Sequence, residues 1–349
     1  MRILLIGGNG FIGPAVVPRL QQLGHEITLF HRGAEQNFYP ELKHIQGDRQ
    51  ELPNYAEAFR ELAPDVVVDF ILSSGRQARE LMDTFKGIAR RVVALSSMDV
   101  YRACAILQGL EKGPLQPIPL AEDADLRTTR QTYPPQMIQV LRGTFAWVDT
   151  EYDKIPVEQT ILSDKELPGT ILRLPFVYGP GDRLHRLFHI VKRVDDGRKV
   201  ILMDEAAAQW RGPWGYVENV GAAIVAAITS EQAAGRVYNV AEPHGWNELE
   251  WTRKIAEAAG WRGEITVAPS AVAPAHLKKN GNLQQHWLPD TTRIRRELGY
   301  REPVEIEQAL KTTIAWERAN PPQILDPSRY DYAAEDACLE LLAATKNKA

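Results

Sequence analysis

The sequence predicts an α/β fold, a Rossmann-type doubly wound parallel sheet with a smaller C-terminal lobe interleaved with it. Two observations predict this fold. The chain begins with a short apolar run, a glycine-rich turn and an amphipathic stretch, which is the order strand, turn, helix. Further apolar runs, DVVVDFIL and RVVALSS, alternate with helical patterns at a spacing typical of parallel strands joined by helices.

The first turn is the stretch GGNGFIG, which carries Gly7, Gly10 and Gly13. Glycines let main-chain N–H groups approach a diphosphate, and the N-terminus of the next helix adds partial positive charge. Gly13 also lets that helix pack closely against the first strand. We therefore expect this turn to bind the diphosphate of a dinucleotide through Gly7, Gly10, Phe11, Ile12 and Gly13.

The second strand, within HEITLF, ends at His31 and Arg32. Enzymes that bind NAD place an Asp or Glu near this position, where the carboxylate accepts hydrogen bonds from the adenosine ribose. His31 stands there instead and the cationic Arg32 follows it, which favours the 2′-phosphate of NADP over NAD. The alternative is that Arg32 is a solvated loop residue.

Two further strands end in polar residues. The third strand, LKHIQGD, ends at Asp48, and the fifth, RVVALSS, leads into residues 96–101. Ligands of doubly wound sheets bind beyond the carboxyl ends of the strands. The glycine turn, Arg32, Asp48 and residues 96–101 should therefore gather along one edge of the sheet.

The domain organisation follows from where this alternation breaks. We expect residues 1–175 to form the dinucleotide-binding domain, with an irregular insertion at about 102–147. The insertion carries five prolines among charged residues and is too long for a simple loop, which predicts an active-site flap or a dimer contact. A helix is predicted over 151–164. Residues 176–320 should form the substrate lobe, and residues 321–349 a C-terminal tail.

Composition argues against several kinds of partner. The chain of 349 residues has 41 Lys and Arg against 45 Asp and Glu, a formal net charge of −4, and no basic stripe that favours nucleic acid. The N-terminus enters a strand directly and no apolar run approaches membrane-spanning length, so we expect a cytoplasmic protein without membrane contact. Cys104 and Cys338 should be separate thiols. We expect no metal site.

Several blocks of the sequence together resemble the extended short-chain dehydrogenase/reductase superfamily, and within it the NAD-dependent epimerase/dehydratase family. The blocks occur in the family's order over residues 1 to about 318. They are GGNGFIG, the GD at Asp48, SSMDVY, LRLPFVYGPGD, GYVENVGAAI, VYNVAEP and ELGYREP. The resemblance implies a nicotinamide cofactor, NADP or NAD, and a small-molecule substrate.

The resemblance also implies roles for individual residues. Asp48 matches the acid that contacts the adenine. Ser97 matches the catalytic Ser or Thr, with Ser96 beside it at the cofactor. The family's Pro-x-x-Tyr-Gly segment lines the nicotinamide and substrate pocket. It reads PFVYG here, which assigns Pro175 and Val177 to the cofactor and Tyr178 to the substrate.

The central catalytic pair departs from the family pattern. Family members carry Tyr-x-x-x-Lys on one helix face, where the lysine holds the nicotinamide ribose and lowers the pKa of the phenol. Here the segment reads DTEYDKIPVEQ, so Lys154 has Thr150 four residues before it. A threonine alcohol cannot replace a phenol in acid/base catalysis.

Three solutions are open, in order of preference. Pro156 can make the helix begin late, so that Tyr152 lies in an extended segment and reaches the pocket. Asp99, two residues past Ser97, can supply an acid/base carboxyl, as in some dehydratases that resemble this family. The third solution is that the site has lost its chemistry.

The leading hypothesis is an NAD(P)-dependent oxidoreductase of the epimerase/dehydratase type. It would act by hydride transfer on a hydroxyl or carbonyl carbon of a sugar-like substrate that can be nucleotide-linked. In the substrate lobe, the family would present His185, Arg186, His189, Trp210 and Arg211 to a sugar diphosphate. Taken singly, each of these is more simply a surface or packing residue, and only Arg211 is assigned, to a phosphate. Trp210 could stack on a base or sugar. The alternative is a catalytically silent NADP(H)-binding or sensing protein. Relatives often pair through a four-helix contact, so the resemblance implies a homodimer that uses the helix carrying Lys154.

Overall fold

The central feature of the computed structural model, which describes residues 1–33, 39–130 and 133–346, is a seven-stranded parallel sheet. Its strand order is β3–β2–β1–β4–β5–β6–β10, so the winding direction reverses between β1 and β4. Such a reversal opens a crevice at the carboxyl ends of the strands. The strands are β1 Arg2–Ile6, β2 Glu26–His31, β3 Lys43–Gln46, β4 Val66–Asp69, β5 Arg91–Ser97, β6 Gly169–Leu174 and β10 Val237–Asn239.

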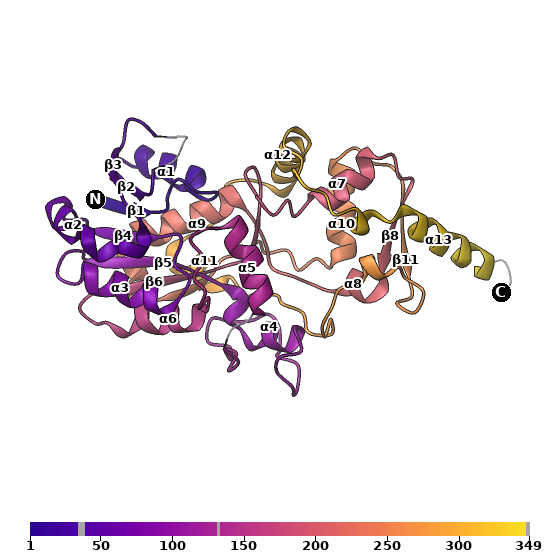
Figure 1. Cartoon of the computed structure of the whole chain (residues 1–349), viewed down its shortest axis with the longest axis horizontal. Coiled ribbons are helices and arrows are strands. Elements are labelled where there is room, and N and C mark those ends of the chain that lie inside the picture. The colour runs from indigo at the N-terminus through magenta and orange to yellow at the C-terminus, as the bar shows by residue number, and fades with distance from the viewer. Residues whose placement is uncertain (34–38, 131–132, 347–349) are drawn as a thin grey trace.

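Helices cover both faces of this sheet (Figure 1). One face packs on α1 Gly13–Gln22 and α9 Val217–Thr229; the other packs on α2 Ala56–Leu62, α3 Gly75–Phe85 and α6 Lys154–Ser163. Side chains of β1 alternate between the two cores, because Ile3 and Leu5 lie in the first and Leu4 and Ile6 in the second. This double burial explains why the strands read as continuous apolar runs.

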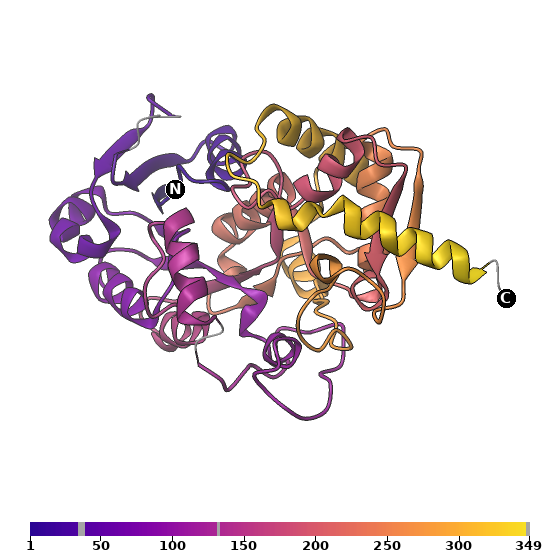
Figure 2. The same ribbon diagram turned by 45° about the vertical axis from the view of Figure 1, so that its right-hand side comes forward.

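The second half of the chain alternates between a smaller lobe and the sheet. The lobe contains two pairs of parallel strands, β7 Phe176–Tyr178 with β9 Trp214–Tyr216 and β8 Val200–Asp204 with β11 Glu264–Ala268. Its helices are α7 Phe188–Asp195, α8 Glu205–Gln209, α10 Glu248–Ala258, α12 Ile306–Ala319 and α13 Tyr332–Lys346. Figure 2 shows α13 crossing the lobe toward the C-terminus. Because α9, β10 and α11 Thr292–Leu298 pack with the sheet side, the lobe is interleaved, as predicted.

The predicted insertion is more regular than expected. It contains α4 Arg102–Leu107 and α5 Pro135–Thr144, and α5 lies at the front of the sheet domain in Figure 1. Short 3₁₀ helices complete the secondary structure, at Arg49–Tyr55, Met98–Val100, Glu231–Ala233, Ala275–Leu277 and Pro327–Tyr330. The helix expected over 151–164 begins three residues later, at Lys154, because Asp153 is extended and caps it.

Two simpler expectations can be compared with the structure directly. Cys104 and Cys338 are both free and buried, which confirms that they are separate thiols. Among the described helices, none combines the length and the apolar character needed to cross a membrane.

Candidate active site

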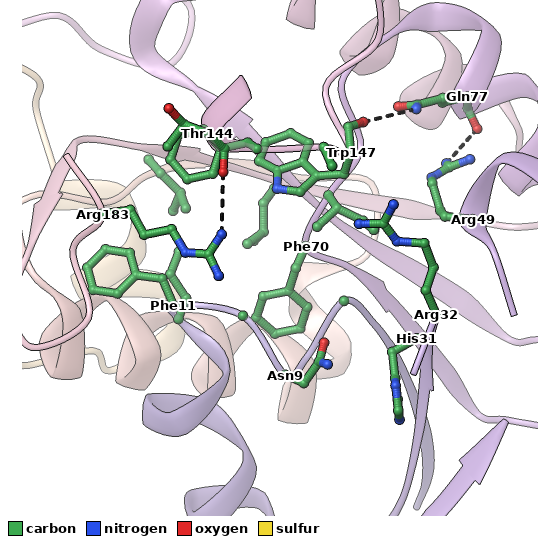
Figure 3. A pocket seen from close by; sticks show the side chains of 18 of the residues that line it. Asn9, Phe11, His31, Arg32, Arg49, Phe70, Gln77, Thr144, Trp147 and Arg183 are labelled. Carbon is green, nitrogen blue, oxygen red and sulfur yellow. Dashed lines mark hydrogen bonds between the residues drawn. The ribbon is translucent and has the colours of Figure 1, made fainter. Parts of the chain in front are cut away.

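A cavity of about 970 Å³ lies at the carboxyl ends of β1, β2, β4, β5 and β6 (Figure 3). The structure brings most of the predicted site residues to this cleft. The predicted residues that line it are Gly7, Gly10, Phe11, Ile12, Arg32, Asp48, Ser96, Ser97, Tyr152, Lys154, Pro175 and Val177. Four predicted residues are not part of its lining, namely Gly13, Asp99, Tyr178 and Arg211.

The glycine turn presents bare main chain to the cleft. Gly7 has a φ of +78°, which favours glycine, and a Cβ on Gly10 would meet only the carbonyl oxygen of Gly7, at 3.4 Å. Among the described residues, the N–H groups of Phe11 and Ile12 have no hydrogen-bond partner. Two unpaired donors at the N-terminus of α1, with open space in front of them, fit the diphosphate of a dinucleotide.

Gly13, the first residue of α1, allows close packing against this turn. A Cβ at Gly13 would lie 1.7 Å from the carbonyl oxygen of Gly8, a distance that no side chain can occupy. The role of Gly13 is therefore to let α1 pack on the turn.

The end of β2 carries a neutral histidine and an exposed arginine. The N–H of Gly33 donates to His31 Nδ1 at 3.1 Å, so the proton of His31 sits on Nε2 and points to His44 Nδ1, 2.8 Å away. Burial and the neighbouring His44 lower the pKa of His31, which keeps the ring uncharged. Arg32 is exposed and its side chain lies beside the cavity. The positive charge at this strand end therefore comes from Arg32.

Asp48 follows β3 and lies at the same end of the cleft. Its Oδ1 accepts a hydrogen bond from the N–H of Gln50 at 2.9 Å and so caps the 3₁₀ helix Arg49–Tyr55. The other carboxylate oxygen has no hydrogen bond within the described chain and can meet a ligand. Arg49 next to it is buried, and its Nη2 is paired with Asp69 at 3.0 Å.

The opposite end of the cleft holds Tyr152 against a buried carboxyl group. The Tyr152 hydroxyl donates to Asp99 Oδ2 at 2.9 Å, and the Tyr133 hydroxyl lies 3.4 Å from the same oxygen. Burial raises the pKa of Asp99, although Arg127 opposes this shift. Burial and the nearby Asp99 raise the pKa of Tyr152 well above its usual value. Tyr152 is therefore a protonated phenol at neutral pH.

Tyr152 reaches the cleft because long-range contacts hold the segment before α6 extended. The N–H of Asp153 donates to the carbonyl oxygen of Ser73 at 3.0 Å. Arg127 binds the Asp153 carboxylate at 2.5 Å and, through Nε, the carbonyl oxygen of Asp99 at 2.9 Å. The phenol that reaches the cleft therefore belongs to the residue two positions before Lys154 in the sequence. In the family pattern it belongs to the residue four positions before the lysine, one helical turn away. Nothing in the sequence around Arg127 indicates this bridging role.

Lys154 and the two serines complete this end. The Lys154 Nζ donates to the carbonyl oxygens of Leu72 and, at 3.0 Å, Leu95, and burial lowers its pKa to about 8. The Ser97 Oγ accepts from the N–H of Asp99 at 3.2 Å, which leaves its own proton available to a ligand. Ser96 instead donates to Glu158 at 2.6 Å and is tied into the fold.

The residues expected to face the substrate lie elsewhere. Tyr178 is fully buried, and its hydroxyl donates to Glu242 Oε1 at 3.0 Å. Trp210 is buried in an aromatic cluster with its indole N–H on the carbonyl oxygen of Gln285. Arg211 is exposed but does not line the cleft. The structure therefore does not bring Tyr178, Trp210 and Arg211 together as a substrate subsite, because β7 and the loop after α8 are packed into the lobe.

Other lining residues were missed in the sequence. The end of α5 and the segment after it, from Gly143 to Trp147, lie across the cleft from the glycine turn (Figure 3). Asp182 and Arg183 line the cleft from the loop after β7, together with Arg186, which was already a candidate from the resemblance. A signal for this loop was present, since it follows a strand end within the PFVYGPGD block. The C-terminal part of the predicted insertion therefore borders the cleft.

Comparisons with known proteins agree with this architecture. A model of the NAD dependent epimerase/dehydratase family matches residues 3–241. The chain is similar to 2′-dehydrokanamycin reductase from Streptomyces kanamyceticus, with 25% identity over 265 residues that cover 71% of this chain and 64% of the reductase. It is also similar to the chloroplast stem-loop binding protein of 41 kDa b from Arabidopsis thaliana, with 22% identity over 327 residues, 88% of this chain and 77% of that protein. The matched region thus spans less than two thirds of the reductase.

A solved structure gives the same fold. The dTDP-glucose 4,6-dehydratase from Bacillus anthracis, in complex with NAD, superposes with a TM-score of 0.64 and 18% identity, covering 93% of this chain and 98% of that one. At this identity the likeness concerns the fold alone. The family match extends over most of the chain and includes the glycine turn, the Ser97 loop and the segment of Tyr152 and Lys154. The chain therefore belongs to the NAD-dependent epimerase/dehydratase family.

Proposed function

We propose that this protein is an NAD(P)-dependent oxidoreductase that reduces a carbonyl group of a sugar-like substrate, with epimerase or dehydratase chemistry as variants of the same hydride transfer. The observation that carries the proposal is the phenol of Tyr152, which lines the cleft, as Ser97 does, and donates a hydrogen bond to the buried Asp99. Similarity to a protein named as a reductase supports the reductive direction.

The cofactor would lie along the carboxyl ends of the strands. The free N–H groups of Phe11 and Ile12 would hold its diphosphate and Asp48 its adenine, and Arg32 would bind a ribose 2′-phosphate, which favours NADP. Lys154 would bind the hydroxyls of the nicotinamide ribose. When bound, the nicotinamide supplies or accepts the hydride.

Tyr152 would donate the proton. Reduction of a carbonyl group places negative charge on its oxygen, which an O–H donor within hydrogen-bond reach stabilises and protonates. Ser97 can donate to the same oxygen. Asp99, whose pKa is raised by burial, can hold a proton and pass it to the Tyr152 oxygen 2.9 Å away. With Asp99 protonated, the phenol proton is free to point to the substrate.

The substrate is proposed to be a sugar-like carbonyl compound. The lining of the cleft also includes the apolar side chains of Pro175, Val177 and Trp147, which can contact apolar parts of a ligand. Of the residues considered for a sugar diphosphate, Arg186 lines the cleft, whereas Trp210 and Arg211 do not. Free sugars and nucleotide-linked sugars therefore both belong in the assay.

The test is consumption of NADPH, and of NADH, with a panel of keto- and aldehydo-sugars that includes nucleotide-linked members. For an active substrate we expect Tyr152→Phe to lower kcat by about 10²- to 10⁴-fold, the usual contribution of a positioned general acid. Tyr133→Phe is the matched control. This substitution also removes a hydroxyl group that lies near Asp99. Because Tyr133 does not line the cleft, kcat should change only a few-fold.

Two results would contradict the proposal. Full activity of Tyr152→Phe would remove the assignment of the proton donor. Tight NADPH binding without turnover on any member of the panel would favour the alternative, a silent binding protein. That alternative is motivated by the displaced Tyr-x-x-x-Lys pair, but the presence of both Tyr152 and Lys154 in the cleft supports the enzyme.

A further inference from the structure

The loop after β7 rests directly on the glycine turn. A Cβ at Gly181 would lie 3.3 Å from the ring of Phe11, so the main chain of this loop is already in close contact with the turn. Gly181 has a φ of +91° and Gly179 a φ of +143°, conformations that L side chains rarely adopt. A segment from the second half of the chain thus borders the predicted diphosphate site.

The same loop is held in place by a buried carboxylate. Asp182 accepts from the N–H of Leu184 at 3.0 Å and from Arg186 Nη1 at 2.6 Å, and it is almost fully buried. His185, next in the loop, binds Glu317 at 2.7 Å. These contacts use Arg186 in an ion pair inside the loop. They also fix the main chain of Arg183, which lies between Asp182 and Leu184.

Unlike Arg186, Arg183 does not use its guanidinium in an ion pair within the loop. It is exposed and lines the cleft, and Figure 3 shows it between Phe11 and Thr144. Its one hydrogen bond within the described chain is a long one of 3.4 Å, from Nη1 to the carbonyl oxygen of Thr144 at the end of α5. The described residues give it no carboxylate partner. Most of its five N–H donors remain available to an anion.

We propose that Arg183 binds the cofactor diphosphate from the side opposite the glycine turn, so that the diphosphate lies between main-chain amides of the first half of the chain and a guanidinium of the second. The glycine turn offers main-chain N–H donors on one side of the diphosphate. On the other side, the planar Arg183 guanidinium can donate to two phosphate oxygens at once. This role rests on the proposed function, since it requires that a dinucleotide occupies the cleft. Arg183 and Arg32 then have separate tasks: Arg183 binds the diphosphate and Arg32 the 2′-phosphate.

The experiment measures equilibrium binding by calorimetry with two probes. ADP-ribose carries the diphosphate without a nicotinamide, and adenosine 2′-monophosphate carries a 2′-phosphate without a diphosphate. We expect Arg183→Ala to weaken ADP-ribose binding about 10- to 100-fold and to change binding of the monophosphate less than about twofold. Arg183→Lys, which keeps the charge but not the fork, should fall between. Arg32→Ala should show the opposite selectivity.

Arg142→Ala is the matched control, because Arg142 is an exposed arginine of α5 that does not line the cleft; its affinities should equal those of the unmodified protein. Unchanged ADP-ribose binding in Arg183→Ala would overturn the inference while leaving the proposed function intact. Equal losses for both probes would indicate a structural role and also overturn it. If the unmodified protein binds neither probe, the proposed function fails together with this inference.

Discussion

The two ends of the cleft present different chemical groups to a ligand. At the glycine turn the groups that face the cavity are main-chain N–H groups of consecutive residues, Phe11 and Ile12, exposed because side chains are absent. At the other end they are side chains, Tyr152 and Lys154, held by a buried network that includes Asp99 and Arg127. The main-chain donors of the first end come from one short stretch of chain, and the proposed Arg183 is its contribution from the second half of the chain. The second end depends on segments far apart in sequence.

The charged groups at the two ends of the cleft also differ in how far they are exposed to solvent. Around the glycine turn the positive charges of Arg32 and Arg183 are exposed, where they can attract an anion but contribute little to stability. Around Tyr152 the charges are buried, and burial shifts the pKa values of Asp99, Tyr152 and Lys154. The glycine end is therefore suited to binding, and the Tyr152 end to controlling where a proton resides.

The largest effect is expected at the glycine end. Gly13→Ala places a methyl group against the carbonyl oxygen of Gly8, at a distance of 1.7 Å before relaxation, so α1 must move away from the turn. We expect a loss of about 3 kcal/mol in unfolding free energy and of roughly 100-fold in cofactor affinity. Denaturant unfolding and calorimetric titration measure the two losses.

Gly24→Ala is the control for Gly13→Ala. Gly24 has open space around it and a φ of +74°, so the substitution should cost about 1–2 kcal/mol of stability through backbone strain alone and leave cofactor affinity unchanged. If Gly13→Ala binds the cofactor normally, the turn is not the diphosphate site.

The next largest effect is expected from a substitution in the buried network around Tyr152. Asp99→Asn keeps an acceptor for the Tyr152 hydroxyl but cannot hold and release a proton, so we expect kcat for carbonyl reduction to fall about tenfold or more. In the unmodified protein the reaction should slow as pH rises through the raised pKa of Asp99, because the protonated carboxyl is the active form. The variant should lack this limb of the pH profile.

Asp204→Asn is a suitable comparison for Asp99→Asn, since Asp204 is a buried carboxylate that caps α8 in the smaller lobe and does not line the cleft. Its kcat should stay within a few-fold of the unmodified protein. An Asp99→Asn variant with an unaltered pH profile would show that Asp99 has no part in the proton transfer.

A smaller effect is expected for cofactor choice. We expect NADPH to bind more tightly than NADH and Arg32→Ala to reduce the ratio of the two affinities about tenfold, because one charge-assisted contact to the 2′-phosphate is removed. The ratio is measured by fluorescence titration with each reduced cofactor. Equal affinities in the unmodified protein would count against this role of Arg32.

The smallest effect concerns Lys154. Burial lowers its pKa to about 8, so the ammonium loses its proton as pH rises above that value and can no longer donate to ribose hydroxyls with full strength. Cofactor affinity should therefore decline above about pH 8, by at most about tenfold per pH unit since one proton is involved. Lys154→Met should bind more weakly and without this pH dependence. A flat profile in the unmodified protein would contradict the assignment.

The amino-acid sequence alone determined the fold class, the parallel sheet and the glycine turn. Each follows from interactions between neighbouring residues: apolar runs form strands buried on both faces, and glycines open the main chain at a strand end. Because carboxyl ends of parallel strands meet at one edge, the sequence also predicted that Arg32, Asp48 and Ser97 would share a cleft, and they do.

The tertiary structure alone decided how the proton-transfer end is assembled. Tyr152 reaches the cleft because the next residue, Asp153, is bonded to Ser73 and to Arg127, which lie far away in the chain. No periodicity in the sequence encodes such contacts. The same reason explains why Tyr178, expected at the substrate, is buried in the lobe, and why Arg183 was overlooked. Side-chain networks depend on which distant segments pack together, whereas a glycine turn carries its function within a few consecutive residues.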